Sequence, residues 1–203
     1  IAKEHYGCAQ SLLPYMYEKK YKHTLIIGAP KTGKTSLIRD ITRLISNGWG
    51  SDGSQKVGLV DERSEIAASY KGIPTLQVGR RTDVLDRCPK VEGMMMFIRS
   101  MSPEVLVVDE IGNEKDVQAI QEAMHAGVSV ICTAHAHTIE DIQNRPSFQS
   151  LFQSKSFIRF VHLNPHETPG TIQTVYDAEW NPIYKPFHLG DEKNEMDWRT
   201  AFH

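Results

Sequence analysis

The chain has 203 residues, of which 40% are hydrophobic and 24% are charged, and its formal net charge at pH 7 is -2. This length and apolar content suffice for one well-buried core, so we expect one main domain. The balanced charge argues against a broad electrostatic grip on nucleic acid or anionic lipid. Cys8, Cys88 and Cys132 show no paired spacing, which favours the reducing cytoplasm over a disulfide framework. No apolar run approaches the length of a membrane span.

The first predicted element is a helix at residues 4–20, apolar on one face and interrupted or kinked near Pro14. We expect this helix to pack beside the first strand of the sheet. The chain begins at Ile1 rather than at a methionine, and from this we expect it to be a fragment that lacks an upstream region.

A glycine-rich loop follows the first predicted strand, at residues 24–27, and precedes a helical pattern at 36–45. The loop, GAPKTGKT, fills every fixed position of the nucleotide-binding P-loop, G-x-x-x-x-G-K-[ST]. Its glycines let backbone N–H groups and the positive end of the helix face a phosphate. Lys34 is expected to reach the β- and γ-phosphates, and Thr35 to ligate Mg²⁺. The residues predicted to bind nucleotide here are Gly28, Ala29, Pro30, Lys31, Thr32, Gly33, Lys34, Thr35 and Ser36.

A second buried strand is predicted at residues 56–61, after a turn-rich tract at 46–54. This strand ends in a cluster of charge that includes Asp61, Glu62 and Glu65. Carboxylates at the carboxyl end of a strand in an open α/β sheet lie where ligands bind. These three acids are therefore candidates for the same site as the P-loop.

The next stretch, at residues 79–89, is polar and basic and is predicted to be a loop, with a helix at 91–101 behind it. Two interpretations of its arginines, Arg80, Arg81 and Arg87, stay open. They form a solvated basic loop, or one of them reaches the γ-phosphate of a neighbouring subunit, where it would stabilise transition-state charge.

An apolar run at residues 104–110 ends in two acids, Asp109 and Glu110, which is the form of a Walker B strand. In such a strand Asp109 would hold Mg²⁺, directly or through water, and Glu110 would polarise the attacking water. Such a run is weak evidence alone, but a P-loop upstream makes it strong. A helix at 114–125 follows.

A further buried strand at residues 128–134 delivers Thr133, His135 and His137 to its carboxyl end. We expect Thr133 and His135 to sense the γ-phosphate from a strand beside the P-loop. A hydrogen-bonded structural histidine is the alternative. Cys132 and the two histidines lack a fourth ligand at zinc spacing, so a zinc site is not favoured.

The last third of the sequence changes from helical to strand-like patterns. A short helical region is predicted at residues 139–153. Strands are predicted at 157–163, 171–177 and 182–184, with a hairpin turn at 178–181.

Several segments together resemble the stage III sporulation protein AA family of spore-forming bacteria. They are the P-loop, VDERSEI, GRRTDVLDRCPK, EGMMMFIRSMSPEVLVVDEIG and TAHAHT, and the resemblance covers residues 1–184. The family is similar to type II and type IV secretion and pilus ATPases, which are RecA-like hexamers. The resemblance implies an α/β fold: a RecA-like P-loop core with a mostly parallel sheet, flanking helices and a C-terminal antiparallel extension. It implies an ATPase domain at 1–190, a tail at 191–203 and an N-terminal family domain absent from this chain.

The resemblance also assigns roles to residues. Asp61, Glu62 and Glu65 match the aspartate box of the secretion ATPases, and Thr133 and His135 match their histidine box. The chain departs from them at Asp109, where a glycine is usual, and near Asn113, where an arginine is usual. The predicted catalytic residues are Glu110, Lys34, Glu62, Glu65 and His135; the predicted metal ligands are Thr35, Asp109 and Asp61; Thr133 joins the nucleotide-binding set.

The leading functional hypothesis is Mg²⁺-dependent ATP hydrolysis by a homo-hexameric motor. By resemblance, the ring would power or assemble a secretion-like channel between mother cell and forespore. It would lie in the mother-cell cytoplasm, held at the membrane by a membrane-protein partner. One alternative is a P-loop kinase of a small molecule or nucleotide, for whose basic lid the segment 80–87 is short. Another is a non-catalytic ATP-binding nucleic-acid or switch module, against which the charge balance and the acidic pair at 109–110 weigh.

Overall fold

The computed structural model describes residues 6–49 and 53–184; the predictions for residues 1–5, 50–52 and the tail at 191–203 lie outside this part of the chain. Within it, a seven-stranded sheet has the order β3-β2-β4-β5-β1-β6-β7. Neighbouring strands are parallel except β6 and β7, which pair antiparallel. The strands are β1 (Thr24–Gly28), β2 (Val57–Asp61), β3 (Thr82–Asp86), β4 (Val105–Val108), β5 (Ser129–His135), β6 (Arg159–Leu163) and β7 (Ile172–Tyr176).

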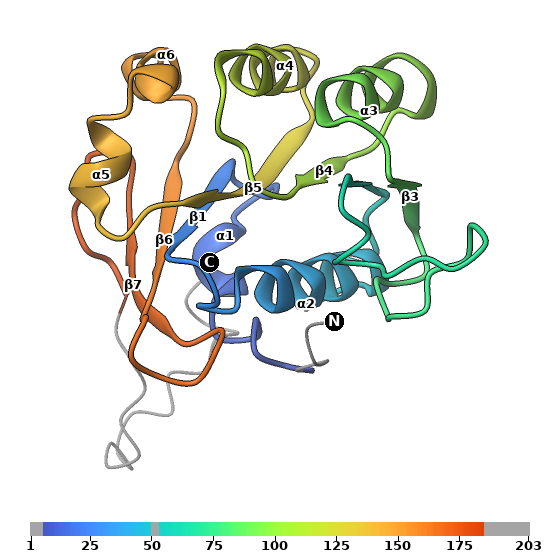
Figure 1. Cartoon of the computed structure of the whole chain (residues 1–203), viewed down its shortest axis with the longest axis horizontal. Coiled ribbons are helices and arrows are strands. Elements are labelled where there is room, and N and C mark those ends of the chain that lie inside the picture. The colour runs from blue at the N-terminus through green and yellow to red at the C-terminus, as the bar shows by residue number, and fades with distance from the viewer. Residues whose placement is uncertain (1–5, 50–52, 185–203) are drawn as a thin grey trace.

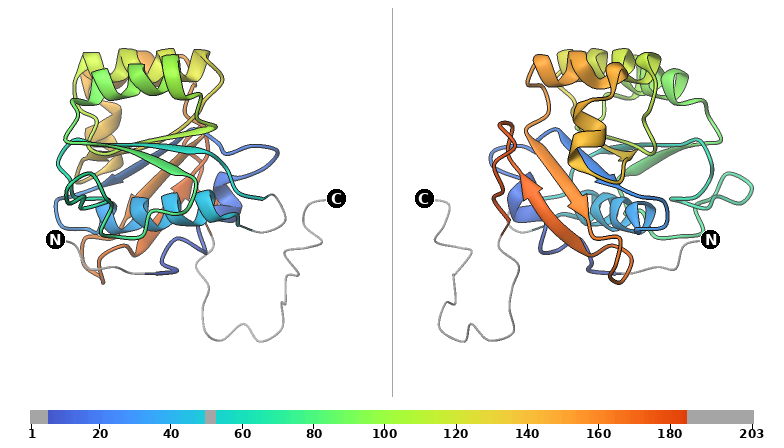
Figure 2. Two further views of the ribbon diagram at one scale, coloured as in Figure 1. Left: turned by 90° about the vertical axis from the view of Figure 1, so that its right-hand side faces the viewer. Right: turned by 60° about the vertical axis from the view of Figure 1, so that its left-hand side comes forward.

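Helices cover both faces of the sheet (Figures 1 and 2). One face packs against α3, α4, α5 and α6, and the other packs against α1 and α2. None of the described helices is both long and apolar enough to span a membrane. The helices are α1 (Leu13–Met16), α2 (Lys34–Asn47), α3 (Lys90–Met96) with the π-helical η1 (Phe97–Met101), α4 (Glu114–His125), α5 (Ile139–Gln143), the 3-10 turn η2 (Pro146–Phe148) and α6 (Gln149–Gln153).

Strand β1 shows why the central strands appear in the sequence as continuous apolar runs. All five of its residues are buried. Leu25 and Ile27 pack in the core on the α4 side, whereas Ile26 packs in the core on the α2 side. Because both faces of a parallel sheet are covered, apolar residues are needed at successive positions.

The helix after the glycine-rich loop is α2, and it contains the predicted segment at residues 36–45. Its N-cap is Gly33, whose φ of 90° is in the left-handed region that favours glycine. Its C-cap is Gly48, whose N–H donates to the carbonyl oxygen of Ile45 at 3.3 Å. The helix therefore runs along the sheet directly behind the loop that precedes it.

Two predictions near the termini are wrong. The expected helix at residues 4–20 is reduced in the described part to the single turn α1, with Pro14 in its first turn. Gly7 has a positive φ of 83°, and the residues between form turns rather than a continuous helix. The strand expected at 182–184 is only an isolated bridge between Tyr176 and Pro182. A proline lies at both places, Pro14 in α1 and Pro182 in the bridge. Because proline has no backbone N–H, it cannot donate the hydrogen bond that a longer helix or strand would need there.

The segment expected to be a basic loop contains the edge strand β3. Its side chains are all half-buried, and it pairs with β2 from Val57↔Thr82 to Asp61↔Asp86. Its sequence is polar because β3 pairs with a neighbouring strand on one edge only, and its two faces are only partly covered. The loop between β2 and β3 projects from this side of the molecule (Figures 1 and 2).

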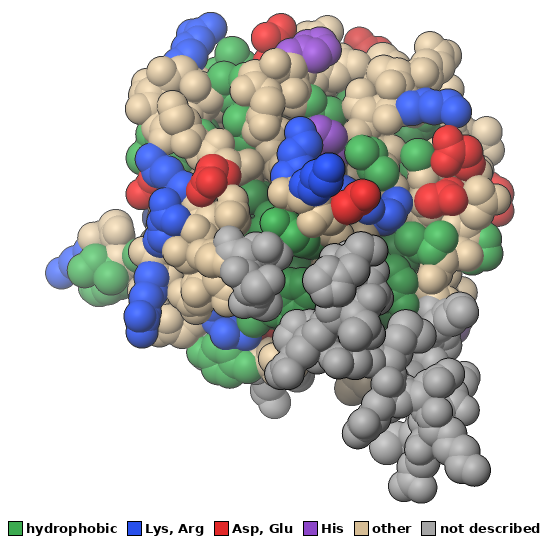
Figure 3. Space-filling view, turned by 180° about the vertical axis from the view of Figure 1, so that it is seen from behind, with side chains coloured by type: hydrophobic (Ala, Val, Ile, Leu, Met, Phe, Trp, Pro, Cys, Tyr) green, Lys and Arg blue, Asp and Glu red, His purple; other side chains and the backbone are tan. Residues whose placement is uncertain are grey.

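The surface carries charges of both signs. On the face in Figure 3, Lys and Arg side chains are interspersed with Asp and Glu side chains and with uncharged surface. This distribution matches the near balance of 23 basic and 25 acidic residues in the sequence.

Candidate nucleotide-binding site

The register of the central strands brings the main candidate residues together. Gly28 at the end of β1 pairs with His135 of β5. The last residue of β4 pairs with Cys132 of β5, so Asp109 emerges beside Thr133. Since β5 lies between β1 and β4, its carboxyl end joins the P-loop to the acids that follow β4.

Lys34 has several partners at the end of β1. Its Nζ donates to the carbonyl oxygens of Gly28 and Ala29, at 2.8 and 2.9 Å, and lies 2.9 Å from Nδ1 of His135. An ammonium group can only donate, so Nδ1 accepts, and a neutral ring carries its hydrogen on Nε2. Burial lowers the pKa of Lys34, and the nearby acids oppose this shift.

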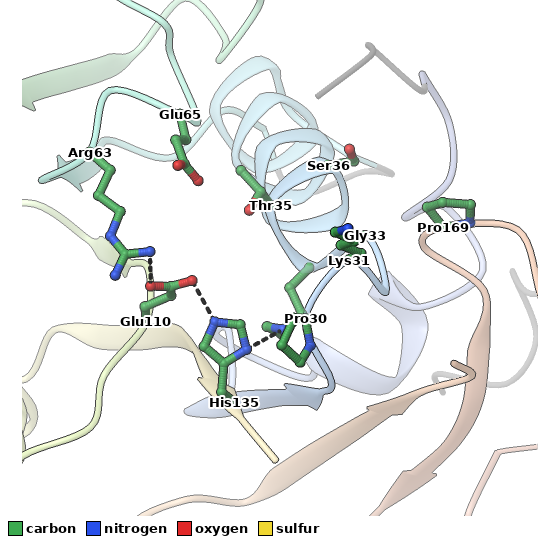
Figure 4. Close-up of a pocket in the computed structure, with 11 residues that line it drawn as sticks. Pro30, Lys31, Gly33, Thr35, Ser36, Arg63, Glu65, Glu110, His135 and Pro169 are labelled. Carbon is green, nitrogen blue, oxygen red and sulfur yellow. Dashed lines mark hydrogen bonds and ion pairs between the residues drawn. The ribbon is translucent and has the colours of Figure 1, made fainter. Parts of the chain in front are cut away.

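Glu110 continues this network (Figure 4). Nε2 of His135 lies 2.6 Å from Oε1 of Glu110, and Arg63 forms an ion pair with Oε2. The backbone of Glu110 is in the left-handed region, with a φ of 51°. Its position just past the end of β4 thus turns its side chain toward His135 and Arg63. A continuous set of contacts runs from Lys34 through His135 and Glu110 to Arg63.

Asp109 lies behind this network. The Thr133 hydroxyl donates to Oδ1 of Asp109, and the N–H of Glu110 donates to that hydroxyl oxygen at 2.8 Å. The hydroxyl of Thr35 lies 3.5 Å from the other oxygen, Oδ2. Burial raises the pKa of Asp109, and the hydrogen bond from Thr133 opposes this shift. A hydroxyl and a carboxylate are ligands that Mg²⁺ accepts, so these side chains fit the metal.

Asp61 is not brought to the pocket. It is 1% exposed, and its carboxylate accepts backbone N–H bonds from Glu65, Ile66 and Ala67 at 2.8–3.3 Å. These bonds fix the loop after β2. Arg39 of α2 fixes it from the other side, by donating to the carbonyl oxygens of Glu65 and Ile66 at 2.6 and 2.5 Å. The expectation that Asp61 ligates metal is therefore replaced by a role in holding the loop.

The other two acids of this segment, Glu62 and Glu65, lie in different places relative to the pocket. Glu62 pairs with Lys90 at 2.6 Å, which lowers the pKa of Glu62, and it does not line the pocket. Glu65 does line it. Of the arginines considered in the sequence, Arg80 and Arg81 precede β3 at the amino edge of the sheet, away from the P-loop.

The pocket has a volume of about 570 Å³, within the range typical of cofactor sites. One wall comes from the P-loop and the start of α2, and the opposite wall comes from the ends of β2, β4 and β5 (Figure 4). Gly28, Ala29 and Thr32 support the first wall from behind; the Thr32 hydroxyl donates to Ala29 O at 2.9 Å. The lining residues from the P-loop side are Pro30, Lys31, Gly33, Lys34, Thr35 and Ser36. Arg63, Glu65, Glu110 and His135 face them, whereas Pro169 lies beside the P-loop.

Sequence reasoning missed Arg63 and Pro169 in this lining. Arg63 stands within VDERSEI, whose acids predict a ligand site, but no pattern in the segment indicates that the arginine faces the same site. Pro169 belongs to the β6–β7 loop, where the N–H of Gly170 donates to the carbonyl oxygen of Thr32 at 2.8 Å. A Cβ at Gly33 would lie 2.2 Å from the nitrogen of Gly170. No local pattern marks that long-range contact.

Among the described residues, no group of three or more His, Cys, Asp and Glu side chains is placed to hold a metal ion. Cys132 is fully buried, and its thiol lies 3.9 Å from the carbonyl oxygen of Thr24. The two protein ligands suggested above, Thr35 and Asp109, suit Mg²⁺, which takes its remaining ligands from water and phosphates.

The fold defines a class: a RecA-like P-loop domain. It matches the VirB11 ATPase of the Brucella suis type IV secretion system in complex with sulphate, with a TM-score of 0.56 and 16% identity, over 85% of this chain and 51% of that one. It also matches the Yersinia pseudotuberculosis ATPase DotB, with a TM-score of 0.58 and 13% identity, over 82% and 46%. The pilus retraction motor PilT with bound ADP matches with a TM-score of 0.52 and 14% identity, over 80% and 48%. At these identities the likeness is one of fold.

The chain belongs to the family described as sporulation stage III, protein AA, whose model matches residues 1–182. It is 52% identical over 183 residues to the stage III sporulation protein AA of Bacillus subtilis (strain 168), covering 90% of this chain and 60% of the relative. It is 33% identical over 129 residues to the protein SEEDLING PLASTID DEVELOPMENT 1 of Arabidopsis thaliana, covering 63% and 18%. The family and the fold predicted from the sequence are confirmed.

Proposed function

We propose that this pocket binds ATP with Mg²⁺ and hydrolyses it. The observation that carries the proposal is the network from Lys34 through His135 to Glu110, which crosses the ends of β1, β5 and β4 beside a pocket of about 570 Å³. These residues are far apart in the sequence, and in the fold they form one composite site. The family membership and the fold of the secretion ATPases support the same activity.

The P-loop wall supplies the phosphate contacts. Lys34 now satisfies its ammonium group with two backbone carbonyls and His135, all of which a β- or γ-phosphate can replace with stronger, charge-assisted bonds. The first-turn N–H groups of α2 have no acceptor within the helix, and they lie at its positive end. The anion is thereby held with its terminal phosphate toward His135.

Thr35 and Asp109 would hold the Mg²⁺ ion. When bound, the ion neutralises phosphate charge and orients the phosphates. Thr133 holds Asp109 by its hydroxyl, and the N–H of Glu110 in turn fixes that hydroxyl. The Thr133 side chain and the backbone N–H of Glu110 thus keep the Asp109 carboxylate aimed at Thr35, at the start of α2.

Glu110 is the proposed general base. Its carboxylate would accept the proton of the water that attacks the terminal phosphate, a role that contributes roughly 10²–10⁴-fold in rate. His135 orients it by contact with Oε1. Glu65 lines the same pocket from the loop after β2 and is proposed to help hold the attacking water.

We further propose that the chain acts within a hexameric ring that powers or assembles a sporulation channel between mother cell and forespore. In this proposal the ring lies in the mother-cell cytoplasm and binds a membrane-protein partner. An arginine from 80–87 would reach a neighbouring subunit's site. The chain spans 60% of the length of its Bacillus subtilis relative.

Phosphate release from ATP, measured with Mg²⁺ and with no acceptor, tests the activity. We expect release that a metal chelator abolishes. Arg99→Ala, which changes an exposed arginine outside the pocket, should leave the rate unchanged. Release that requires an added acceptor molecule would instead identify a kinase, and binding without release would identify a non-catalytic module.

A further inference from the structure

Arg63 stands at the rim of the pocket opposite the P-loop (Figure 4). Its side chain is 59% exposed, whereas that of its partner Glu110 is only 18% exposed. The guanidinium is thus the more exposed partner of this ion pair, and it lines the pocket that the phosphates would fill. No step of the proposed hydrolysis has used it.

Two buried side chains, those of Asp61 and Arg39, hold the backbone that follows Arg63. Asp61 accepts N–H bonds from residues 65, 66 and 67, and Arg39 donates to the carbonyl oxygens of Glu65 and Ile66. Arg39 belongs to α2, the helix that begins at the P-loop. The position of the Arg63 backbone relative to the P-loop is therefore held by β2 and α2. A change of partner by Arg63 then requires movement of its side chain alone.

Both carboxylate oxygens of Glu110 are engaged: His135 contacts Oε1 and Arg63 contacts Oε2. A direct contact with a guanidinium keeps water from one of these oxygens. In this arrangement Glu110 is restrained from acting.

We propose, on the basis of the proposed function, that Arg63 binds the terminal phosphate of the nucleoside triphosphate and thereby leaves Glu110. A terminal phosphate carries more negative charge than one carboxylate, and its oxygens match the planar fork of a guanidinium. The exchange frees Oε2 of Glu110 at the moment when a triphosphate is present. A diphosphate does not reach Arg63, so the ion pair persists and Glu110 stays restrained.

Equilibrium binding of two probes tests this, each with Mg²⁺: ADP and the non-hydrolysable β,γ-imido analogue of ATP. Arg63→Ala should weaken binding of the triphosphate analogue roughly tenfold or more, the effect of losing a charged hydrogen bond, and leave ADP affinity unchanged. Arg63→Lys should recover part of the loss. Arg99→Ala, a matched change of an exposed arginine outside the pocket, should alter neither affinity.

A double-mutant cycle tests the exchange itself. Glu110→Gln removes the competing carboxylate, so it should raise affinity for the triphosphate analogue, and more so when Arg63 is present than in the Arg63→Ala background. Additive effects would overturn the exchange. Equal loss of both probes in Arg63→Ala would indicate only a structural role and overturn the proposal, as would no loss at all. If the wild-type protein bound neither probe, the proposed function itself would fail, which separates the two claims.

Discussion

The ammonium group of Lys34 is held by the carbonyl oxygens of Gly28 and Ala29 and by His135, all of which are neutral acceptors. Burial disfavours its charged form and lowers its pKa. A bound phosphate would stabilise the charged ammonium group, as water does for an exposed lysine. The residue is thus placed to gain more from binding an anion than an exposed lysine would.

Lys34→Ala should lower affinity for ATP by roughly ten- to a hundredfold, because charged hydrogen bonds to two phosphates are lost. Isothermal titration with Mg²⁺ and a non-hydrolysable analogue measures this. Lys155→Ala removes a lysine that is 67% exposed and pairs with Glu179, away from the pocket, and it serves as the control. Undiminished binding by Lys34→Ala would count against the P-loop interpretation.

The buried carboxylate of Asp109 lowers the stability of the folded chain at neutral pH. Because burial raises its pKa above the unfolded value, the ionised carboxylate is disfavoured by folding at neutral pH. Asp109→Asn should therefore raise the free energy of unfolding at neutral pH while abolishing Mg²⁺-dependent turnover. The stability difference should shrink as the pH falls below the folded pKa of Asp109, and it should vanish below the unfolded pKa of about 3.9, where the side chain is neutral in both states. Urea denaturation across pH 3–8 measures this. A stability gain that persisted unchanged at low pH would exclude this cause.

At the scale of elements, the P-loop depends on the β6–β7 loop. Gly33 has a φ of 90°, and a Cβ there would lie 2.2 Å from the nitrogen of Gly170. Gly170 in turn donates its N–H to Thr32. Close backbone packing thus joins the P-loop to the β6–β7 loop, and it places Pro169 in the pocket.

Gly33→Ala should destabilise the fold by the left-handed backbone cost, about 1–2 kcal/mol, plus the cost of displacing the β6–β7 loop. Gly127→Ala is a matched control, because Gly127 also has a positive φ, of 83°, but no atom lies within 4 Å of its added Cβ. Chemical denaturation of both variants isolates the loop contact. Equal losses would show that the loop contributes nothing.

The elements differ in how far the sequence predicted them. The P-loop, helix α4 and the apolar strands are local patterns, and the structure has them at the predicted places. Strand β3 was missed because an edge strand needs fewer apolar residues than a central one. The pairing of Gly28 with His135 is a register between distant segments. The predictions that Thr133 and His135 lie near the P-loop followed from strand ends, but their contacts with Lys34, Asp109 and Glu110 required the register.

Arg63 and Asp61 show the same limit within one segment. A charged cluster at a strand end predicted a ligand site, and Glu65 and Arg63 do line the pocket. The buried carboxylate of Asp61 instead binds three backbone N–H groups. The path of the loop decides which charged side chain faces the pocket. The composition of the segment does not determine that path. Asn113 caps α4 by accepting the N–H of Asp116.

At the scale of the whole molecule, the proposed ring makes the activity depend on assembly. If a neighbouring subunit supplies an arginine to each site, phosphate release per molecule should rise steeply with protein concentration and then level off. The measurement is made on this chain over a range of protein concentrations, with light scattering to follow the molar mass. Strict proportionality between rate and concentration, with a constant monomer mass, would favour a self-sufficient site.

The central claim is that one composite site binds ATP through Lys34 and hydrolyses it through Glu110. Turnover and binding should therefore separate in Glu110→Gln: Mg²⁺-dependent phosphate release from ATP should fall roughly 10²–10⁴-fold, while affinity for the triphosphate is kept or raised. Measuring both quantities on one preparation, beside wild-type protein and Arg99→Ala, gives the most direct test. Phosphate release by Glu110→Gln at the wild-type rate would contradict the account.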